Sequence, residues 1–169
     1  MRRGPDRVTV GTTARSARDR FACVEDLDRQ ILKRLTADGR MSYTDLGRAT
    51  GLSTSAVHQR VRKLEERGAI LGYTTNIDAT AIGLPLTAFI AITPLDPSAP
   101  DDAPERLEAL PAIEACYSVA GDESYLLKVR VPTPLDLEAL LGEIRAVANV
   151  RTRTTVVLST PYESRPPAL

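Results

Sequence analysis

The sequence predicts an α+β protein with a helical first half and a second half that alternates strands and helices. Apolar residues recur at helical spacing up to about residue 67, and Gly51 separates the last two helical stretches. From residue 70 onward, short apolar runs rich in β-branched residues are typical of strands. Residues 1–78 carry 15 Lys and Arg against 10 Asp and Glu, whereas residues 79–169 carry 7 against 12. We therefore expect two domains, of which only the basic first one meets a polyanion.

Two predicted helices precede Gly51. The apolar positions of the first helix, spaced three and four apart, are Leu27, Ile31, Leu32 and Leu35. Ser42 can cap a second helix over residues 43–50, with Leu46 and Ala49 facing inward. Gly51 ends this helix, because glycine tolerates the positive φ of a sharp corner.

A third predicted helix begins after Ser53, which can cap it, and stops before Gly68. Its buried stripe consists of Val57, Val61 and Leu64. The other face carries residue types that hydrogen-bond base edges and phosphates, and two helices meeting at a glycine are typical of a helix-turn-helix. We therefore favour DNA contact over a merely solvated face. The residues expected to contact DNA are Ser53, Thr54, Ser55, His58, Gln59, Arg62 and Lys63.

The domain boundaries follow from these changes in pattern. Residues 1–22 are rich in arginine and lack apolar periodicity, so we expect a disordered basic tail. Three alternatives stay open for this tail: it contacts DNA phosphates, it is inert, or it is not part of the natural protein because translation begins at a later start codon. Residues 23–78 are expected to form a winged helix-turn-helix domain, with the helix-turn-helix at about 41–67 and a linking strand over 70–77. Residues 79–162 form the second domain, and 163–169 a flexible C-terminal tail.

The second domain shows the order β-α-β-β-α-β. Strands are predicted over 86–92, 113–119, 125–131 and 150–158, with a short helix over 105–110 between the first two. A second helix begins at Thr133-Pro134, and its buried face is expected at Leu137, Leu140, Leu141, Ile144 and Val147. This order predicts a ferredoxin-like unit with both helices on one face of an antiparallel sheet. A second copy is the simplest cover for the other face, so we expect a homodimer with two recognition helices roughly 34 Å apart.

Other classes of function find little support in the sequence. No apolar run reaches the length of a membrane span, and the N-terminus lacks the apolar core of a secretory signal, so a cytoplasmic, nucleoid-associated location is expected. Cys23 and Cys116 are too few for a disulfide framework or a metal site, and Cys116 is expected to be a small buried hydrophobe. The single histidine, His58, has no neighbouring cysteine or paired acid. We therefore expect neither an enzyme nor a metal cofactor.

Four motifs follow one another in order over about residues 25–162. They read DLDRQILKRLTADGR, LSTSAVHQRVRKLEERGAILGY, VAGDESYLLKVRV and NVRTRTTVVLS. In these motifs the chain resembles the Lrp/AsnC family, the feast/famine transcription regulators of bacteria and archaea, and within it the actinobacterial leucine-responsive branch. The resemblance implies a sequence-specific regulator of amino-acid metabolism or starvation genes. It also implies an amino-acid-sensing (RAM-type) second domain and dimers that assemble to octamers.

The resemblance further implies a site for a free amino acid, as effector, near a Gly-Asp turn and the last strand. The matching positions are Gly121, Asp122, Glu123, Ser124, Thr152 and Thr154. An acidic side chain can accept hydrogen bonds from the ammonium group, while hydroxyls and the glycine backbone can donate to the carboxylate. Ordinary turn chemistry and the strand preference of threonine are the alternative explanations. Ser124 stands where the family has an aspartate or similar acid, which bears on the choice of effector.

Two other binding functions stay open at this point. One is an architectural, nucleoid-type protein that wraps DNA without an effector response. The other is a winged helix that binds RNA or a protein partner. Duplex affinity that falls steeply with salt is required for DNA binding.

Overall fold

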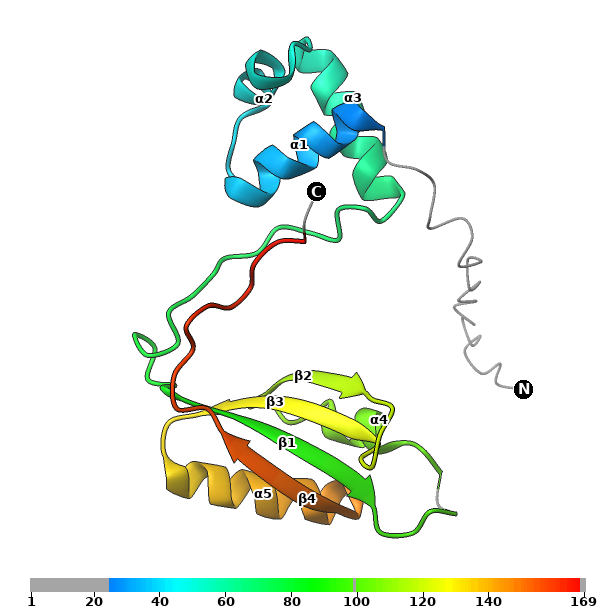
Figure 1. The fold of residues 1–169 in the computed structure, drawn as a ribbon, viewed down its shortest axis with the longest axis vertical. Helices are drawn as coiled ribbons and strands as arrows, with labels where there is room; N and C mark the ends of the chain where they lie inside the picture. Colours follow the sequence, from blue (N-terminus) through cyan, green and yellow to red (C-terminus); the bar gives the residue numbers. More distant parts are fainter. Residues whose placement is uncertain (1–24, 99, 168–169) are drawn as a thin grey trace, which may run out of the picture. The chain divides into compact units, whose positions relative to one another are not determined.

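The structure is a computed structural model that describes residues 25–98 and 100–167. The described chain divides into two compact units, one with residues 25–75 and 165–167 and the other with Asn76–Ser164 (Figure 1). The predicted tail over residues 1–22 and Cys23 lie outside the described residues. The fold class is confirmed, because helices alone form the first unit and a four-stranded sheet with helices forms the second.

The first unit contains α1 (Asp26–Ala37), α2 (Tyr43–Thr50) and α3 (Thr54–Glu66). The predicted caps are present: the Ser42 hydroxyl accepts a hydrogen bond from the Asp45 N–H at 3.1 Å, and the Ser53 hydroxyl accepts one from Ala56 at 3.2 Å. The three helices share a small core whose buried members are Ile31, Leu46, Val57, Val61 and Leu64. This core holds α3 in place and leaves one of its faces in solvent.

The corner between α2 and α3 is unusually tight. Gly51 adopts a left-handed conformation with φ of 73°, and the Leu52 N–H donates to the Gly47 carbonyl at 3.0 Å. A Cβ atom at Gly47 would lie 2.6 Å from the Leu52 carbonyl oxygen. The expectation that Ala49 faces inward is wrong, because the backbone after the corner covers the Gly47 side of α2 and leaves Ala49 exposed.

The strand predicted over residues 70–77 is also wrong for the single chain. Residues 71–78 contain neither strand nor helix, and Leu71 and Ile77 are 95% and 59% exposed. Tyr, Thr and Ile favour strands, but a strand needs a neighbouring backbone to pair with, and this segment finds none within the described residues.

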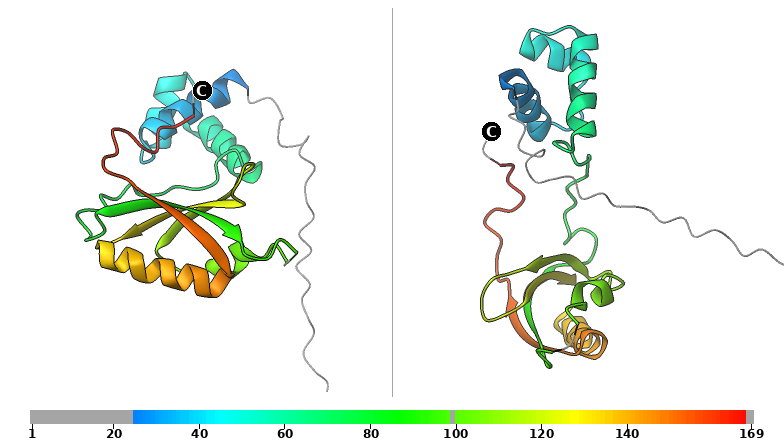
Figure 2. Two further views of the ribbon diagram at one scale, coloured as in Figure 1. Left: turned by 60° about the horizontal axis from the view of Figure 1, so that its bottom comes forward. Right: turned by 90° about the vertical axis from the view of Figure 1, so that its right-hand side faces the viewer.

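The second unit contains a single sheet with the strand order β2-β3-β1-β4 (Figures 1 and 2). Its elements are β1 (Leu86–Pro94), α4 (Ala103–Leu107), β2 (Ile113–Ser118), β3 (Tyr125–Val131), α5 (Pro134–Ala148) and β4 (Val150–Val156). All neighbouring strands are antiparallel, and Ile90 lies opposite both Leu127 and Thr154. A bulge interrupts the β2–β3 pairing between Ile113 and Ala115. The predicted order β-α-β-β-α-β is confirmed.

Helices α4 and α5 cover the same face of the sheet (Figure 2). The Thr133 hydroxyl caps α5 by accepting from the Asp136 N–H at 3.2 Å, and Asn149, at φ of 53°, turns the chain directly into β4. The core between sheet and helices includes Ala88, Ile90, Ile92, Leu107, Leu127, Val129, Leu137, Leu140 and Ile144. We call the other face the uncovered sheet face. It is lined by the alternate residues Thr87, Phe89, Ala91 and Thr93 of β1, Leu126, Lys128 and Arg130 of β3, and Arg151, Arg153 and Thr155 of β4.

Two burial predictions in this unit are wrong. Val147 is 40% exposed, and Ala148 lies in the core instead. Residues four apart lie on the same face of a helix, and Ala148 follows the buried Ile144 by four residues. Cys116 is exposed, because β2 is an edge strand and the short helix α4 covers it incompletely. None of the helices in the described ranges is both long and apolar enough to cross a membrane.

Candidate functional site

The seven residues predicted to contact DNA all lie exposed on α3 or at its N-cap. Ser53 uses its hydroxyl locally, since it caps the helix and lies 3.1 Å from the Ser55 hydroxyl. The first turn of α3 contains no acidic residue, so no carboxylate in that turn neutralises the positive end of the helix dipole. Such a helix end favours a phosphate group.

His58, Gln59 and Arg62 lie in the middle of α3, on its solvent-exposed face. The ring of His58 meets the ring of Tyr43 edge to face, with ring centres 5.4 Å apart, so α2 restrains its position. The Arg62 Nε donates to the Glu66 carboxylate at 2.8 Å, and the Arg62 side chain is 72% exposed. An ion pair this exposed is weak, so Arg62 can exchange Glu66 for a phosphate at little cost.

One arginine of α3 points the other way, which the sequence reasoning missed. Arg60 Nη1 lies 2.7 Å from Asp28 Oδ1 and 2.9 Å from Glu25 Oε2. The Asp28 side chain is only 8% exposed, and its ion pair connects α1 to α3. The hydrogen bond from Arg60 holds the pKa of Glu25 below its usual range. The available signal was Asp28 itself, a charged residue within the apolar stripe of α1.

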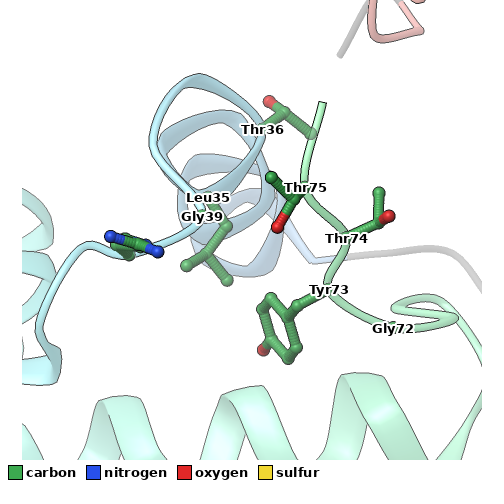
Figure 3. Close-up of a pocket in the computed structure, with 8 residues that line it drawn as sticks. Leu35, Thr36, Gly39, Gly72, Tyr73, Thr74 and Thr75 are labelled. Carbon is green, nitrogen blue, oxygen red and sulfur yellow. The ribbon is translucent and has the colours of Figure 1, made fainter. Parts of the chain in front are cut away.

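The segment after α3 stays attached to the helical unit through Tyr73. Figure 3 shows the Tyr73 ring directed toward α3, from a segment that lies beside the end of α1. The Tyr73 hydroxyl donates to Glu65 Oε1 at 3.0 Å, and burial, with this hydrogen bond, raises the pKa of Tyr73 to about 12. A cavity of about 600 Å³ separates this segment from α1, and it is lined by Leu35, Thr36, Gly39, Arg40, Gly72, Tyr73, Thr74 and Thr75.

Three of the six predicted effector residues meet at one hollow of the second unit. A shallow cavity of about 210 Å³ is lined by Ala91, Thr93, Asp122, Glu123, Arg151, Thr152 and Arg153. Arg153 donates to the Glu123 carboxylate, with its Nε 2.9 Å from Oε1. The Thr152 hydroxyl accepts from Arg145 of α5 at 3.3 Å. This cavity offers charges of both signs within a small space.

The other three predicted effector residues lie elsewhere. Ser124 lines a neighbouring cavity of about 340 Å³ with Thr93, Pro94, Pro97 and Asp101. Thr154 lies opposite Ile90 on the helix-covered side of β4. Gly121 lines neither cavity, and a Cβ atom there would meet no atom within 4 Å. The turn of this chain therefore does not itself require a glycine at position 121.

Charge pairing within the small cavity decides which groups can receive a ligand. Glu123 is occupied by Arg153, whereas Asp122 forms no ion pair with any described residue. Arg151 and the Thr93 hydroxyl can donate hydrogen bonds to a carboxylate, and Asp122 can accept them from an ammonium group. In the described residues, no group of three or more His, Cys, Asp or Glu side chains could hold a metal ion.

Comparisons with known proteins agree with this arrangement of two units. The AsnC-type helix-turn-helix domain matches residues 25–65, and the Lrp/AsnC ligand binding domain matches residues 87–167. The HTH-type transcriptional regulator LrpA of Mycobacterium tuberculosis is 54% identical over 142 residues, which are 84% of this chain and 95% of that protein. The leucine-responsive regulatory protein of Escherichia coli is 38% identical over 146 residues, 83% and 88% of the two chains.

A solved structure also resembles this fold closely. It is a feast or famine regulatory protein from M. tuberculosis complexed with L-methionine. The two chains are 54% identical, with a TM-score of 0.83 over 85% of this chain and 97% of the other.

Proposed function

Because this chain belongs to the Lrp/AsnC family of transcriptional regulators, we propose that it binds specific DNA sites and responds to a free amino acid. Its targets would be genes of amino-acid metabolism or starvation, and its place the cytoplasm, on the nucleoid. The exposed polar face of α3 carries the proposal, since it lies on a capped helix held by a compact core. The proposed DNA contacts are Ser53, Thr54, Ser55, His58, Gln59, Arg62 and Lys63.

The amino-acid response is proposed for the small cavity beside Asp122. Its charges of both signs suit a zwitterion, and a relative of 54% identity is known in complex with L-methionine. We assign the ammonium to Asp122, with Glu123 and Thr152 lining the same cavity. Ser124, Thr154 and Gly121, which the sequence also suggested for this site, lie outside the cavity. The cavity of one chain is shallow, so a second copy would have to complete it.

Assembly is proposed to proceed through the uncovered sheet face. A second copy packed on this face would form a homodimer, with further assembly to an octamer. Two-fold symmetry would then place two copies of α3 roughly 34 Å apart, the spacing of successive major grooves.

One observation favours the alternative of an architectural, DNA-wrapping protein without an effector response. Arg153 already neutralises Glu123, so half of the charge in the cavity is satisfied without a ligand. The two functions share DNA binding and differ in whether an amino acid changes it.

A footprinting experiment tests both parts of the proposal, DNA binding and the response to an amino acid. Affinity for an operator duplex should fall steeply with added salt, because phosphate contacts release counterions. Footprints should shift when one of the proteinogenic amino acids, methionine and leucine first, is added. Footprints that no amino acid changes would favour the architectural function, and salt-independent affinity would refute DNA binding through α3.

Replacing Arg62 and Gln59 by alanine should separate phosphate contact from base reading. Arg62→Ala should weaken binding to all duplexes about equally and reduce the salt slope by about 1. Gln59→Ala should weaken operator binding roughly tenfold and relax sequence preference. Competition titrations against operator and random duplexes over a salt series measure both. Unchanged affinity in both variants would mean that another surface reads DNA.

Asp122→Asn and Thr154→Val should differ in their effect on the effector. The first removes the carboxylate proposed for the ammonium group and should weaken amino-acid binding roughly tenfold. The second alters a residue that the cavity does not include and should change affinity little. Isothermal titration with methionine measures both variants. A larger loss of methionine affinity in Thr154→Val than in Asp122→Asn would instead place the site on the helix-covered side of β4.

A further inference from the structure

A cavity of about 440 Å³ opens on the helix-covered side of the second unit, where α4 and α5 lie against the sheet (Figure 2). We call it the α5 cavity, because four of the residues that line it come from α5. Sites for small molecules usually measure about 300–1,000 Å³ and are mostly apolar. The α5 cavity therefore has the size and the lining of a site for a small molecule with an apolar body. Its apolar walls include Leu84, Leu110, Pro111, Val131, Pro132 and Leu140.

The walls of the α5 cavity are fixed by contacts within the chain. One wall is the connection between α4 and β2, which backbone hydrogen bonds hold in place. The Ile113 N–H donates to the Leu110 carbonyl at 3.0 Å, and the Arg130 N–H of β3 donates to the Ala112 carbonyl at 3.0 Å. The facing wall is α5, which Leu140, at 5% exposure, anchors in the core. The cavity therefore exists before a ligand binds, as is usual for small-molecule sites.

Two acidic side chains, Asp136 and Glu143, lie at the rim of the α5 cavity. They are two helical turns apart along α5, which places them on the same face of the helix. The Thr133 hydroxyl donates to one oxygen of Asp136 at 2.5 Å, so the other oxygen is left for a ligand. Glu143 forms no ion pair or hydrogen bond with any of the described residues. The rim therefore offers two carboxylates to a cationic group.

No unpaired cation faces these carboxylates from the described residues that line the cavity. Arg130 is the cation of that set, and its Nε lies 2.7 Å from the Glu114 carboxylate. The positive end of the α5 dipole is already offset by Asp136 in the first turn of the helix. A carboxylate on a ligand would therefore meet like charges and no partner, which disfavours amino acids and fatty acids at this site.

We propose that the α5 cavity binds small apolar amines, whose alkyl chain packs on its walls while the ammonium group contacts Asp136 and Glu143. The hydrogen bond between an ammonium group and a carboxylate is charge-assisted and therefore strong. Such a ligand is an apolar amino acid without its carboxyl group, the kind of product that a decarboxylation supplies. The α5 cavity shares no residue with α3 or with the cavity beside Asp122, and it lies on the other side of the sheet from the proposed dimer contact. This site therefore does not rest on the proposed function.

Three compounds that share one branched carbon chain test the ligand class. They are 3-methylbutylamine, 3-methylbutanol and leucine, and ligand-detected NMR titration of the full-length protein measures their binding at neutral pH. The amine should bind roughly twofold to fivefold more tightly than the alcohol, which corresponds to the usual strength of an exposed charge contact. Leucine should not displace the amine. An amine that does not bind, that binds no more tightly than the alcohol or that leucine displaces would overturn the proposal.

Two leucine substitutions on α5 locate the bound amine. Ala139 and Ala146 are both exposed, and of the two Ala139 alone lines the α5 cavity. Ala139→Leu should lose amine binding because the larger side chain fills the cavity, whereas Ala146→Leu should bind the amine as the wild type does. Circular dichroism checks that both variants keep their helices. Equal amine affinity in the two variants would refute the site.

Carboxylate variants separate this site from the cavity beside Asp122. Glu143→Gln should weaken amine binding roughly twofold to fivefold. Glu138→Gln removes an exposed carboxylate of α5 that does not line the α5 cavity, and it should have no effect. Asp122→Asn should leave amine binding unchanged even where it lowers methionine affinity. Unchanged amine binding in Glu143→Gln, or its loss in Asp122→Asn, would refute the proposal. The comparison of the three compounds uses the wild-type chain, so it decides even if a variant folds poorly.

Discussion

Gly47→Ala is expected to destabilise the helical unit by about 2–3 kcal/mol and to abolish operator binding. The added Cβ would lie 2.6 Å from the Leu52 carbonyl oxygen, closer than real Cβ atoms come to such an atom. The neighbour is backbone, so the corner between α2 and α3 must open. Because this corner sets the direction of α3, the loss of DNA binding should exceed what the fraction of unfolded protein explains.

Gly142→Ala is the matched control for this substitution. Gly142 lies within α5, and a Cβ atom there would meet no atom within 4 Å. Alanine should therefore stabilise the helix by about 0.5–1 kcal/mol, the usual gain over glycine in a helix. Urea unfolding followed by circular dichroism should show opposite signs for the two variants. An equal increase in the free energy of unfolding of both variants would show that a Cβ atom at position 47 fits into the corner without a clash.

Arg60→Ala is expected to destabilise the same unit by about 2–4 kcal/mol. It leaves the carboxylate of Asp28, which is 8% exposed, without its ion-pair partner. Arg62→Ala provides the comparison, because it removes an equally large side chain two residues further along α3. The Arg62–Glu66 pair is exposed, so its loss should change stability by less than about 0.5 kcal/mol.

A double variant separates charge from packing in this prediction. Combining Asp28→Asn with Arg60→Ala removes the unpaired charge and should recover part of the lost stability. Urea midpoints of the single and double variants, measured with the same denaturation slope, give the coupling between the two residues. Additive losses would show that Asp28 and Arg60 act independently.

The elements that the sequence predicted well are those with a local pattern. In β3, the alternation of Tyr125, Leu127 and Val129 with polar or partly exposed residues fixes both the strand and its buried face. In α2, Ser42 and Gly51 mark both ends of the helix. Such signals lie within a few residues of each other, and the helix and the strand form where these signals predict them.

The features that could not be predicted depend on distant neighbours. Residues 70–77 have strand-forming composition, but among the described residues no backbone pairs with them. Cys116 is exposed because β2 falls at the edge of the sheet, a position fixed by strand order and not by its own residues. The direction of Arg60 depends on Asp28, and the contact of Glu163 spans the distance from the C-terminal segment to β3. Apart from Asp28, a charged residue within the apolar stripe of α1, these features leave no trace in the local sequence pattern.

The two hydrophobic cores share no residue, and this bears on how such regulators diversify. Recombination within residues 71–78 cuts no helix or strand and transfers each core intact. A descendant can therefore acquire a new ligand-binding domain while keeping its helix-turn-helix domain, or the reverse. For engineering, the same junction is the natural place to join halves of different regulators into a chimera.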